Sequence, residues 1–421
     1  KTLKNLFAAQ TVTEAMRGLR TVGVLREDER RRLIEVAVPV GVIAGLIPST
    51  NPTSTVIFKT LIALKAGNAI VFSPHPNARE CIQETVRVLS EALSAAGAPK
   101  GLVSCMTVLT REGTSELMRH RDVALILATG GSEMVHAAYS SGTPAIGVGP
   151  GNTPAFIERT ADVPTAVRRI IESKTFDYST ICASEQSVVA DAPVERAVRE
   201  EFARQGGRFL SPDEAAKVAS VIFNAAGKMN ARLVGRSPQM IGEAAGVAVG
   251  PDVRVLLAEQ SGVGRKFPFS QEKLCPVLAF YTEDGWENAC ERCLELLNYE
   301  GAGHTLAIHS QDERVVREFG LKKPVSRIIV NAGSSLGGVG GTTSLLPSLT
   351  LGCGAAGHNA TSDNVGPLNL LNVRRVAWGL REIGELYPES LSPKGTGLDD
   401  PGMDALVGRI VDELAVRLGL D

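Results

Sequence analysis

Short apolar runs alternate with amphipathic segments along the first part of the chain. Runs typical of buried strands lie at 40–47, 69–72, 102–108, 123–128 and 145–148. Helical spacing of apolar residues, clearest over 78–96, predicts helices at 53–66, 78–96, 115–120 and 133–140. Strands that alternate with helices through short turns predict an α/β fold with a doubly wound parallel sheet. Its ligand crevice is expected at the carboxyl ends of the strands.

The pattern continues beyond Pro154 and predicts a second α/β unit. Its expected helices lie at 163–174, 193–204 and 286–297, with a largely helical region at 212–245. Its expected strands lie at 187–190, 277–281, 306–309 and 327–330, and 300–305 is expected to be a turn. Glycine is dense at 333–341 and 349–357, which favours loops that shape a channel over a packed core.

Composition and charge limit the classes of function. The 421 residues are 44% apolar and 21% charged, with a net charge of −2, as expected for a globular protein with two sizeable cores. Neither a nucleic acid nor a membrane is an expected partner, and no apolar run is long enough to span a bilayer. The charged run 26–32 interleaves acids with bases, which favours a solvated hairpin or a subunit contact over nucleic-acid binding.

The chain begins with a pattern typical of the middle of an amphipathic helix, residues 1–10, so we expect it to start inside a longer protein. Seven cysteines, an odd number without regular spacing, favour a reducing, cytoplasmic compartment over a disulfide framework. Cys290 and Cys293 lie in a predicted helix and are assigned to helix packing rather than to metal or redox chemistry. The six histidines lack ligand spacing, so no metal site is predicted.

One cysteine lies where chemistry is expected. Cys182 belongs to a run of small and polar residues, 175–186, between a predicted helix and a predicted strand. A thiol attacks a carbonyl as the thiolate, and helix N-termini and nearby dipoles are expected to lower its pKa in such a place. The alternative is a small buried hydrophobic residue, the usual role of a free cysteine. Local spacing alone leaves both interpretations open.

Two turns are candidates for contact with a cofactor. The turn Thr129-Gly130-Gly131-Ser132 leads from a strand into a helix, where backbone N–H groups approach a phosphate or a nicotinamide. The second strand ends at Ser73-Pro74-His75-Pro76, the place of an adenine ribose in a nucleotide-binding sheet. The ordinary alternatives are a Gly-Gly helix start and a proline-set helix start.

Several motifs, taken in order, resemble one family. They are 47–54 (Ile-Pro-Ser-Thr-Asn-Pro-Thr-Ser), 175–186 around Cys182, 272–276 (Glu-Lys-Leu-Cys-Pro), 303–305 (Gly-His-Thr), and 349–354 with 364–367. Together they resemble the coenzyme A-acylating aldehyde dehydrogenases. These include the aldehyde dehydrogenase half of bifunctional aldehyde–alcohol dehydrogenases and the propionaldehyde and acetaldehyde dehydrogenases of bacterial microcompartments. The resemblance covers residues 1 to about 385, with an N-terminal segment of the family missing.

The resemblance implies roles for individual residues. Cys182 matches the nucleophile, and Asn51, with Thr50 beside it, matches the oxyanion-hole position. Glu272 matches the glutamate that holds the nicotinamide ribose, and His304 matches a histidine that handles substrate or coenzyme. The cofactor-binding set implied in this way is Thr50, Ser73, Pro74, His75, Thr129, Gly130, Gly131, Ser132 and Glu272.

One departure from the hydrolytic aldehyde dehydrogenases is informative. Their general-base glutamate lies in a Glu-Leu-Gly-Gly motif, and the equivalent stretch here begins with Val148. Without a carboxylate to activate water, a thioester on Cys182 is expected to pass its acyl group to coenzyme A, a thiol that needs less activation. The resemblance therefore implies NAD-dependent oxidation of a short aldehyde, propionaldehyde ahead of acetaldehyde, to its acyl-coenzyme A. The alternatives are a hydrolytic enzyme that releases the free acid and an acylating enzyme for another small aldehyde such as sulfoacetaldehyde.

The resemblance also implies an aldehyde dehydrogenase-like domain organisation. A cofactor-binding domain is expected at 1–154, completed by about 361–387, and a catalytic thiol domain at 155–360. Residues 388–402 have the composition of a linker, and 403–421 form an amphipathic tail helix with Met403, Leu406, Val407, Ile410, Val411, Leu414 and Leu418 on one face. Such a tail resembles the peptides that dock enzymes to microcompartment shell proteins, which implies a location in the microcompartment lumen. Packing on its own domain or on a neighbouring subunit is the alternative, since the family forms dimers or tetramers.

Overall fold

The computed structural model describes residues 1–386 and 401–419 of the chain. Two compact units are present. The larger comprises Lys1–Arg26 with Glu35–Arg374 and contains two parallel sheets with their helices. The smaller comprises Glu27–Ile34 with the C-terminal part that begins at Arg375.

A five-stranded parallel sheet forms the first half of the larger unit. Its strands are β3 (Val42–Leu46), β4 (Ala69–Ser73), β5 (Val103–Cys105), β6 (Val123–Thr129) and β7 (Ala145–Val148). They lie in the order β5-β4-β3-β6-β7, and every neighbouring pair is parallel. The direction of winding reverses at β3, which is the doubly wound topology expected from the sequence. The predicted fold class is confirmed.

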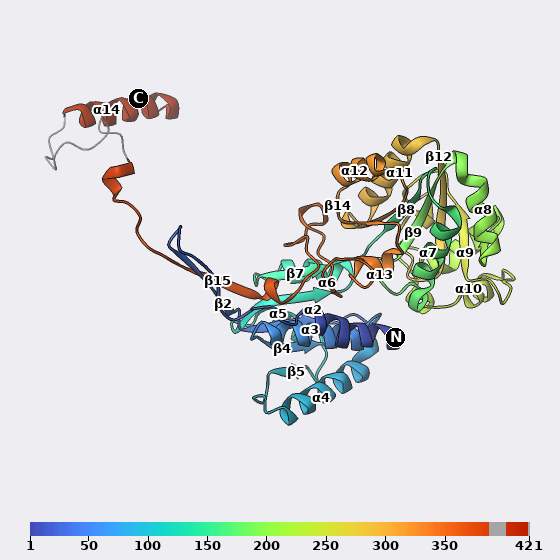
Figure 1. Ribbon diagram of the computed structural model, residues 1–421, viewed down its shortest axis with the longest axis horizontal. Helices are drawn as coiled ribbons and strands as arrows, with labels where there is room; N and C mark the ends of the chain where they lie inside the picture. The colour runs from blue at the N-terminus through green and yellow to red at the C-terminus, as the bar shows by residue number, and fades with distance from the viewer. Residues whose placement is uncertain (387–400, 420–421) are drawn as a thin grey trace. The chain divides into compact units, whose positions relative to one another are not determined.

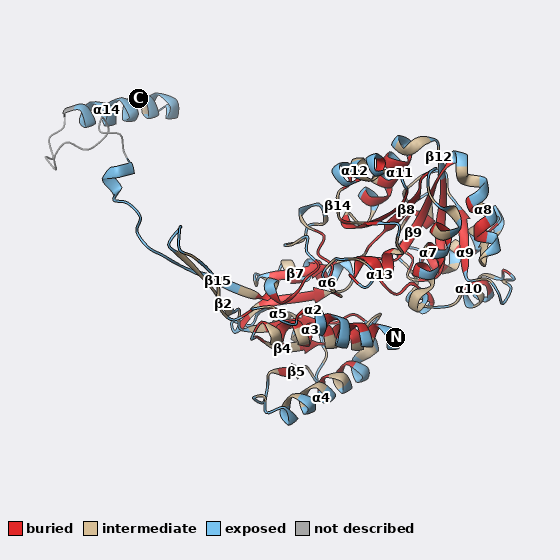
Figure 2. Cartoon of the chain, viewed as in Figure 1, coloured by how far each residue is buried: buried red, intermediate tan, exposed pale blue. Residues whose placement is uncertain are grey.

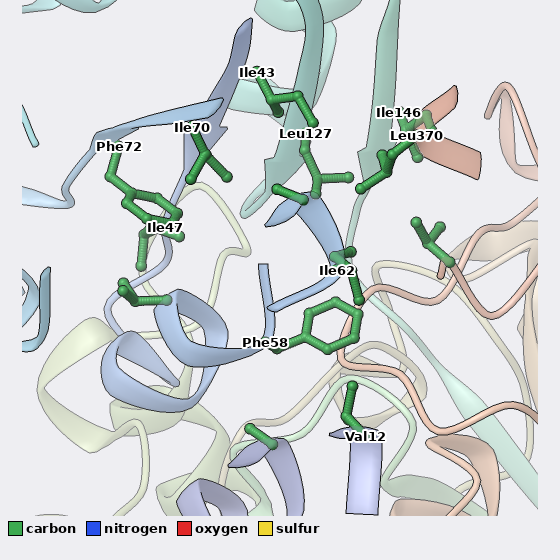
Figure 3. Close-up of a cluster of buried hydrophobic side chains, with 14 of the residues drawn as sticks. Val12, Ile43, Ile47, Phe58, Ile62, Ile70, Phe72, Leu127, Ile146 and Leu370 are labelled. Carbon is green, nitrogen blue, oxygen red and sulfur yellow. The ribbon is translucent and has the colours of Figure 1, made fainter. Parts of the chain in front are cut away.

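Helices cover both faces of this sheet. One face carries α3 (Pro52–Lys65) and α4 (Arg79–Ala95), and the other carries α5 (Arg111–Arg119) and α6 (Ser132–Tyr139). Successive strand residues point to opposite faces, so Ile43 packs in the core with Phe58 of α3 while Ala44 packs in the core with Met118 of α5. Figure 3 shows the first of these cores.

The N-terminal residues form helical turns that pack against α3. They are α1 (Thr2–Leu6), a π-helical turn at Phe7–Thr11 and α2 (Val12–Ala15). Val12 lies in the same core as Phe58 and Ile62, as Figure 3 shows. The amphipathic helix predicted for residues 1–10 is confirmed, and its packing brings Lys4 next to Asn51 at the amino end of α3.

A seven-stranded parallel sheet forms the second half of the larger unit, in the order β10-β11-β12-β9-β8-β13-β14. The strands are β8 (Thr153–Ile157), β9 (Glu185–Asp191), β10 (Gly207–Phe209), β11 (Val255–Glu259), β12 (Val277–Glu283), β13 (Gly303–His309) and β14 (Val325–Val330). One face carries α7 (Val163–Thr175) and α8 (Glu195–Arg204), and the other carries α9 (Pro212–Ile222), α10 (Pro238–Ala245), α11 (Gly285–Tyr299) and α12 (Glu313–Lys322). Figure 1 labels β8, β9, β12 and β14 of this sheet, with α7 and α8 beside them. The strands are largely buried (Figure 2), and Cys290 and Cys293 of α11 lie in this core, which confirms helix packing for the pair.

Several expected elements differ from the structure. The sequence analysis did not predict β8, β10 or β11. Two of these strands carry local signals of a turn: β8 contains Pro154, and β10 is only three residues long and begins at a glycine. The strand expected at 102–108 is reduced to β5, and β13 begins at Gly303, so His304 lies in a strand and not in a turn.

The glycine-rich segment 333–341 is not only a channel-lining loop. It contains a short helix, α13 (Ser334–Gly338), in which four of the five residues are buried. Close packing explains the glycines, because a Cβ added at Gly338 would lie 3.0 Å from the Cβ of Ala183. The expectation of a loop there is wrong for α13, whereas Val339, Leu349 and Leu351 do line a cavity.

The smaller unit contains the tip of a hairpin and the C-terminal helix. The strands β1 (Gly23–Asp28), β2 (Leu33–Pro39) and β15 (Leu371–Ala377) form a three-stranded sheet of order β1-β2-β15, and the hairpin expected at the charged run is confirmed. Helix α14 (Pro401–Leu418) coincides with the expected tail helix, and its seven predicted apolar residues are all exposed. The predicted linker lies outside the described residues except for 401 and 402. None of the described helices is long and apolar enough to cross a membrane.

A buried lysine ties together the strands that meet where the winding reverses. Lys59 of α3 is fully buried, and its ammonium donates hydrogen bonds to the carbonyl oxygens of Leu46 (2.8 Å) and Leu127 (2.7 Å), in β3 and β6. Lys59→Met should leave both carbonyl groups without this donor and lower the free energy of unfolding by about 1–3 kcal/mol. The control Lys65→Met, at the partly exposed end of α3, should change it by less than about 0.5 kcal/mol. Equal shifts of the urea unfolding midpoint in the two variants would contradict this role.

Candidate active site

A cavity of about 910 Å³ opens at the carboxyl ends of the strands of the first sheet. The last residues of four strands line it: Leu46, Ser73, Thr129 and Val148. The crevice expected from the doubly wound topology is therefore confirmed. Residues from the second half of the unit, among them Cys182 and Glu272, line the same cavity.

Most of the predicted site residues meet in this cavity. Those that line it are Thr50, Asn51, Ser73, Pro74, His75, Thr129, Gly130, Gly131, Cys182 and Glu272. Two predicted residues do not line it. Ser132 is the first residue of α6, and His304 is buried near the start of β13.

Cys182 follows a stretch of unusual backbone. Asp177, Tyr178 and Ser179 have φ angles of 48°, 51° and 65°, in the left-handed region that residues with a side chain rarely adopt. The stretch joins α7 to the loop before β9, so Cys182 lies at the junction that the sequence predicts. Three strained residues in succession persist only where the surrounding structure holds them, which is typical of functional sites.

The surroundings of Cys182 raise the pKa of its thiol to about 12. Burial is the largest cause, followed by the nearby carboxylate of Glu272 and the Cys353 thiol, whereas Arg327 opposes the shift. The expectation of a lowered pKa is therefore wrong. The thiol is followed by the strand β9 and so does not lie in the first turn of a helix of its own.

Alkylation of Cys182 should therefore depend strongly on pH. Below a pKa of about 12 the thiolate fraction grows about tenfold per pH unit, so the rate with iodoacetamide should keep rising between pH 7 and 9. The measurement is the pH dependence of modification of the Cys182 peptide by mass spectrometry. A rate that levels off by pH 8 would show a lowered pKa instead.

Asn51 joins the start of α3 to the loop 180–184, which carries Cys182 and is called the thiol loop below. It is the N-cap residue of α3, ahead of Pro52 at the first helical position. Its side-chain NH₂ donates to the carbonyl oxygen of Thr180 at 2.9 Å, and its side-chain oxygen accepts a hydrogen bond from Lys4 at 2.5 Å. The Asn51 amide thus lies beside the loop that carries Cys182, as an oxyanion-hole donor requires.

Lys4 is a site residue that the sequence analysis missed. It lines the cavity, is only 3% exposed, and contacts Asp177 at 2.5 Å. Burial lowers the pKa of Lys4 to about 8, although Asp177 opposes this shift. A sequence signal existed, because Lys4 falls on the same helical face as the buried residues Phe7 and Ala8.

Glu272 is hydrogen-bonded to two other loops, through Gly151 and Glu300. One of its carboxylate oxygens accepts a hydrogen bond from the Gly151 N–H at 3.0 Å, and its own N–H donates to Glu300 at 2.7 Å. Burial and the neighbouring charge of Glu300 raise the pKa of Glu272 to about 8. Near neutral pH this carboxyl group is able both to release and to accept a proton.

His304 and Arg327 form a buried layer near the cavity. The Nδ1 atom of His304 lies 2.9 Å from the Thr305 hydroxyl, and Nε2 has no hydrogen-bond partner among the described residues. Burial, and secondly the charge of Arg327, lower the pKa of His304 to about 3, so the ring is neutral. Arg327 donates to the carbonyl oxygens of His304 (3.0 Å) and Gly352 (2.5 Å), a structural role that no sequence motif indicated.

The two predicted cofactor turns lie in the same cavity. Ser73 at the end of β4 is hydrogen-bonded to Thr114 of α5 at 2.9 Å, and the Nδ1 atom of His75 accepts the N–H of Asn77. Gly131 is the N-cap of α6, and a Cβ added there would meet nothing within 4 Å. The start of α6 therefore faces open space, as a site for a phosphate or a nicotinamide requires.

Comparisons with known proteins agree with this arrangement. The model of the aldehyde dehydrogenase family matches residues 4–340. The bifunctional aldehyde-alcohol dehydrogenase AdhE of Escherichia coli (strain K12) is 46% identical over 382 residues, which cover 90% of this chain and 43% of that protein. The crystal structure of an acetylating aldehyde dehydrogenase from Geobacillus thermoglucosidasius is 54% identical with a TM-score of 0.89, covering 91% of this chain and 84% of that one. A propionaldehyde dehydrogenase from Rhodopseudomonas palustris, solved with bound propionyl-CoA, is 25% identical with a TM-score of 0.78, covering 90% of this chain and 86% of that one.

A large crevice at the carboxyl ends of a doubly wound sheet, joined to a second parallel sheet, is the arrangement of a nucleotide-binding enzyme. The chain belongs to the aldehyde dehydrogenase family. The resemblance to its coenzyme A-acylating members is confirmed. The chain spans less than half the length of AdhE.

Proposed function

We propose that this chain oxidises a short aliphatic aldehyde, propionaldehyde ahead of acetaldehyde, to its acyl-coenzyme A with NAD as the oxidant. One observation carries the proposal. Cys182 lines the cavity together with Val148, an apolar and almost fully buried side chain at the position where the hydrolytic enzymes carry their general base. A thioester formed at Cys182 therefore lacks a carboxylate at that position to activate water.

The first half of the reaction forms a thioester. The Cys182 thiolate attacks the aldehyde carbon, and the carbonyl π electrons move to oxygen, giving a thiohemiacetal alkoxide. The Asn51 amide beside the thiol loop is the proposed N–H donor for that oxygen; its NH₂ group donates to the Thr180 carbonyl oxygen at 2.9 Å and lies 3.4 Å from the Thr50 hydroxyl, and the longer of these two bonds is the one that the alkoxide would replace. When the alkoxide re-forms its C=O bond, hydride leaves the carbon and the acyl group remains on sulfur.

The cavity fits a dinucleotide through residues of the first sheet. The space in front of Gly131, at the start of α6, is unfilled and would take the phosphates or the nicotinamide. Ser73 and His75, at the end of β4, line the part of the cavity that would take the adenosine. The Glu272 carboxylate is partly exposed to the cavity for the ribose, although its hydrogen bond to Gly151 occupies one oxygen. A bound nicotinamide supplies the acceptor for the hydride. NAD is proposed ahead of NADP from the resemblance.

The second half of the reaction transfers the acyl group to another thiol. The thiolate of coenzyme A attacks the thioester carbon, and the Cys182 thiolate leaves, so that acyl-coenzyme A is the product. This attack needs little help, because a free thiol is already a few per cent thiolate near neutral pH. We propose that the neutral, buried His304 contacts the substrate or the coenzyme. Its lowered pKa means that it is not a strong base.

A hydrolytic reaction that releases the free acid is the second candidate. The observation in its favour is Glu272, because a carboxyl group with a pKa of about 8 lines the cavity together with Cys182 and is able to take a proton from water. Its hydrogen bond to the Gly151 N–H and its proposed contact with the ribose oppose this use.

One assay tests the proposal against its alternatives. NADH formation is followed with propionaldehyde and NAD, with and without coenzyme A. Continuous turnover is expected only with coenzyme A, together with a single burst of NADH without it. Equal turnover without coenzyme A would establish the hydrolytic reaction, and no turnover in either case would favour a non-catalytic assembly role.

The identity of the aldehyde needs a separate measurement. One methylene group in an apolar pocket changes discrimination by only about 1–3 kcal/mol, so related aldehydes are expected to react at measurable rates. Comparing kcat/KM for acetaldehyde, propionaldehyde, butyraldehyde and sulfoacetaldehyde should give the highest value for propionaldehyde. A highest value for sulfoacetaldehyde would reassign the substrate class.

We also propose that the tail helix α14 docks the enzyme to microcompartment shell proteins, and that the enzyme works in the microcompartment lumen as a dimer or tetramer. The apolar residues of α14 are exposed, including Leu406 (44%) and Ile410 (51%), as a docking helix requires. Deletion of residues 388–421 should leave the specific activity within about twofold and abolish co-purification with shell proteins. An inactive or aggregated truncation would instead favour packing of the helix within the enzyme.

A further inference from the structure

Lys4 is bound to the machinery of the candidate site from a helix far away in sequence. Its ammonium lies 2.5 Å from the side-chain oxygen of Asn51, 2.5 Å from the Asp177 carboxylate, and 3.0 and 3.1 Å from the carbonyl and hydroxyl oxygens of Thr180. These four acceptors use all three of its N–H donors. Lys4 therefore has no free proton donor for a substrate, and it acts through the groups that it holds.

The contact with Lys4 determines which way the Asn51 amide faces. A lysine ammonium donates hydrogen bonds and cannot accept them, so the amide atom beside it must be the oxygen. The NH₂ group is consequently on the other side, where it donates to the Thr180 carbonyl oxygen at 2.9 Å. In the reverse orientation the NH₂ group would face an ammonium, and the amide oxygen would face a carbonyl oxygen.

Lys4 also holds the strained backbone before the thiol. Asp177 begins the three left-handed residues, and its carboxylate is bound by Lys4, by Lys1 at 2.8 Å and by the Thr180 hydroxyl at 2.7 Å. One ammonium thus connects the amide of Asn51 with the loop that carries Cys182. Asn51 and the loop cannot shift independently while both are bound to Lys4.

We propose that Lys4 is a positioning residue, which keeps the N–H donors of Asn51 turned toward the Cys182 loop, where the aldehyde oxygen becomes an alkoxide. The proposal rests on the proposed function. It assigns Lys4 no contact with the reacting atoms. Its effect should therefore appear in the rate of the acylation step and not in the binding of aldehyde or NAD.

Four variants test this role: Lys4→Met, Asn51→Ala, the double variant, and Asp177→Asn. The measured quantity is the rate of the NADH burst with saturating propionaldehyde and NAD, together with the two KM values. Lys4→Met should lower the burst rate by about 10- to 100-fold, with KM values within about threefold of wild type. In the Asn51→Ala background, Lys4→Met should cause a much smaller loss, no larger than that of Asp177→Asn, because only its contacts with the loop then remain.

The variant Asp177→Asn distinguishes two effects of Lys4: the orientation of the Asn51 amide and the ordering of the loop before Cys182. This variant keeps the bond between Lys4 and Asn51 and weakens the contacts of Asp177 with Lys4, Lys1 and the Thr180 hydroxyl, so its burst rate should fall less than that of Lys4→Met. Lys4→Gln retains an N–H donor and should recover part of the rate, which also provides a second variant if Lys4→Met does not fold. Thermal melting measures folding in each case.

Several results would overturn the proposal. If the fold losses in burst rate of Lys4→Met and Asn51→Ala multiply fully in the double variant, Lys4 acts independently of Asn51. A loss in Asp177→Asn as large as that in Lys4→Met would assign Lys4 to loop order alone. A folded Lys4→Met or Lys4→Gln protein with raised KM and an unchanged burst rate would assign it to binding. Wild-type protein without any NADH formation would overturn the proposed function and this inference together, whereas active wild type with equally active Lys4 variants would overturn this inference alone.

Discussion

Replacement of Cys182 by alanine is expected to lower the rate of NADH formation by at least about 10⁴-fold while the protein remains folded. The thiol is the atom to which the substrate becomes covalently attached, and losses of this size are usual when a covalent nucleophile is removed. Cys182 is intermediate in exposure, packs at the edge of the first core, and its sulfur makes no hydrogen bond to a side chain in the described structure, so alanine removes one small contact and leaves the fold intact. Steady-state NADH formation with propionaldehyde, NAD and coenzyme A measures the first effect, and thermal melting measures the second.

A second cysteine provides the control. Cys81 is exposed on α4, so Cys81→Ala should keep the wild-type rate and melting temperature. The Cys182→Ala protein should also lose the burst of NADH in the absence of coenzyme A, because no thioester can form. A rate near wild type in Cys182→Ala would reject the nucleophile, and with it the proposed mechanism.

The fold of the larger unit follows from features that are visible in the sequence. The first sheet could be predicted strand by strand, because each strand is a short apolar run and each helix, such as α4, has apolar residues at helical spacing. Strand β8 could not be predicted in this way, because Pro154 within it is typical of a turn. In the folded protein β8 is stabilised by pairing with β9 and β13 on either side. Tertiary pairing thus overrides the local signal.

The candidate site was predictable only in part. The family motifs predicted Asn51, Cys182 and Glu272 as parts of one site, and all three line the same cavity. Asn51 follows strand β3 of the first sheet, whereas Cys182 and Glu272 precede β9 and β12 of the second, so the strand pattern alone would not have brought them together. Lys4 could not be found in this way, because its contacts join residues more than forty positions apart, and a lysine in an amphipathic helix normally faces water. The pKa of Cys182 was predicted in the wrong direction, because burial of the thiol raises it and the carboxylate of Glu272, from a distant part of the chain, adds to the rise.

The second large effect is expected at a glycine, because the backbone of the thiol loop lies directly against it. A Cβ added at Gly151 would overlap the carbonyl oxygen of Cys182, lie 3.0 Å from its carbonyl carbon, and lie 3.3 Å from the ring of His304. Backbone atoms cannot rotate away as a flexible side chain can, so Gly151→Ala must move the Cys182 backbone or the loop that contains residue 151. The same movement would disturb the hydrogen bond from the Gly151 N–H to Glu272.

Gly151→Ala should consequently lower the acylation rate by about 100-fold or more, since a displacement of about 1 Å at a reacting group has effects of that size. Gly149→Ala, two residues earlier in the same loop, is the matched control. A Cβ there would meet nothing within 4 Å, so its loss should be at least tenfold smaller. Burst kinetics at saturating propionaldehyde measure both rates, and the rate of iodoacetamide modification reports whether the thiol has moved. Equal activity of the two variants would show that the close approach of Gly151 to Cys182 does not position the thiol, and the positioning would then have to come from the bonds that Lys4 and Asn51 make with the loop.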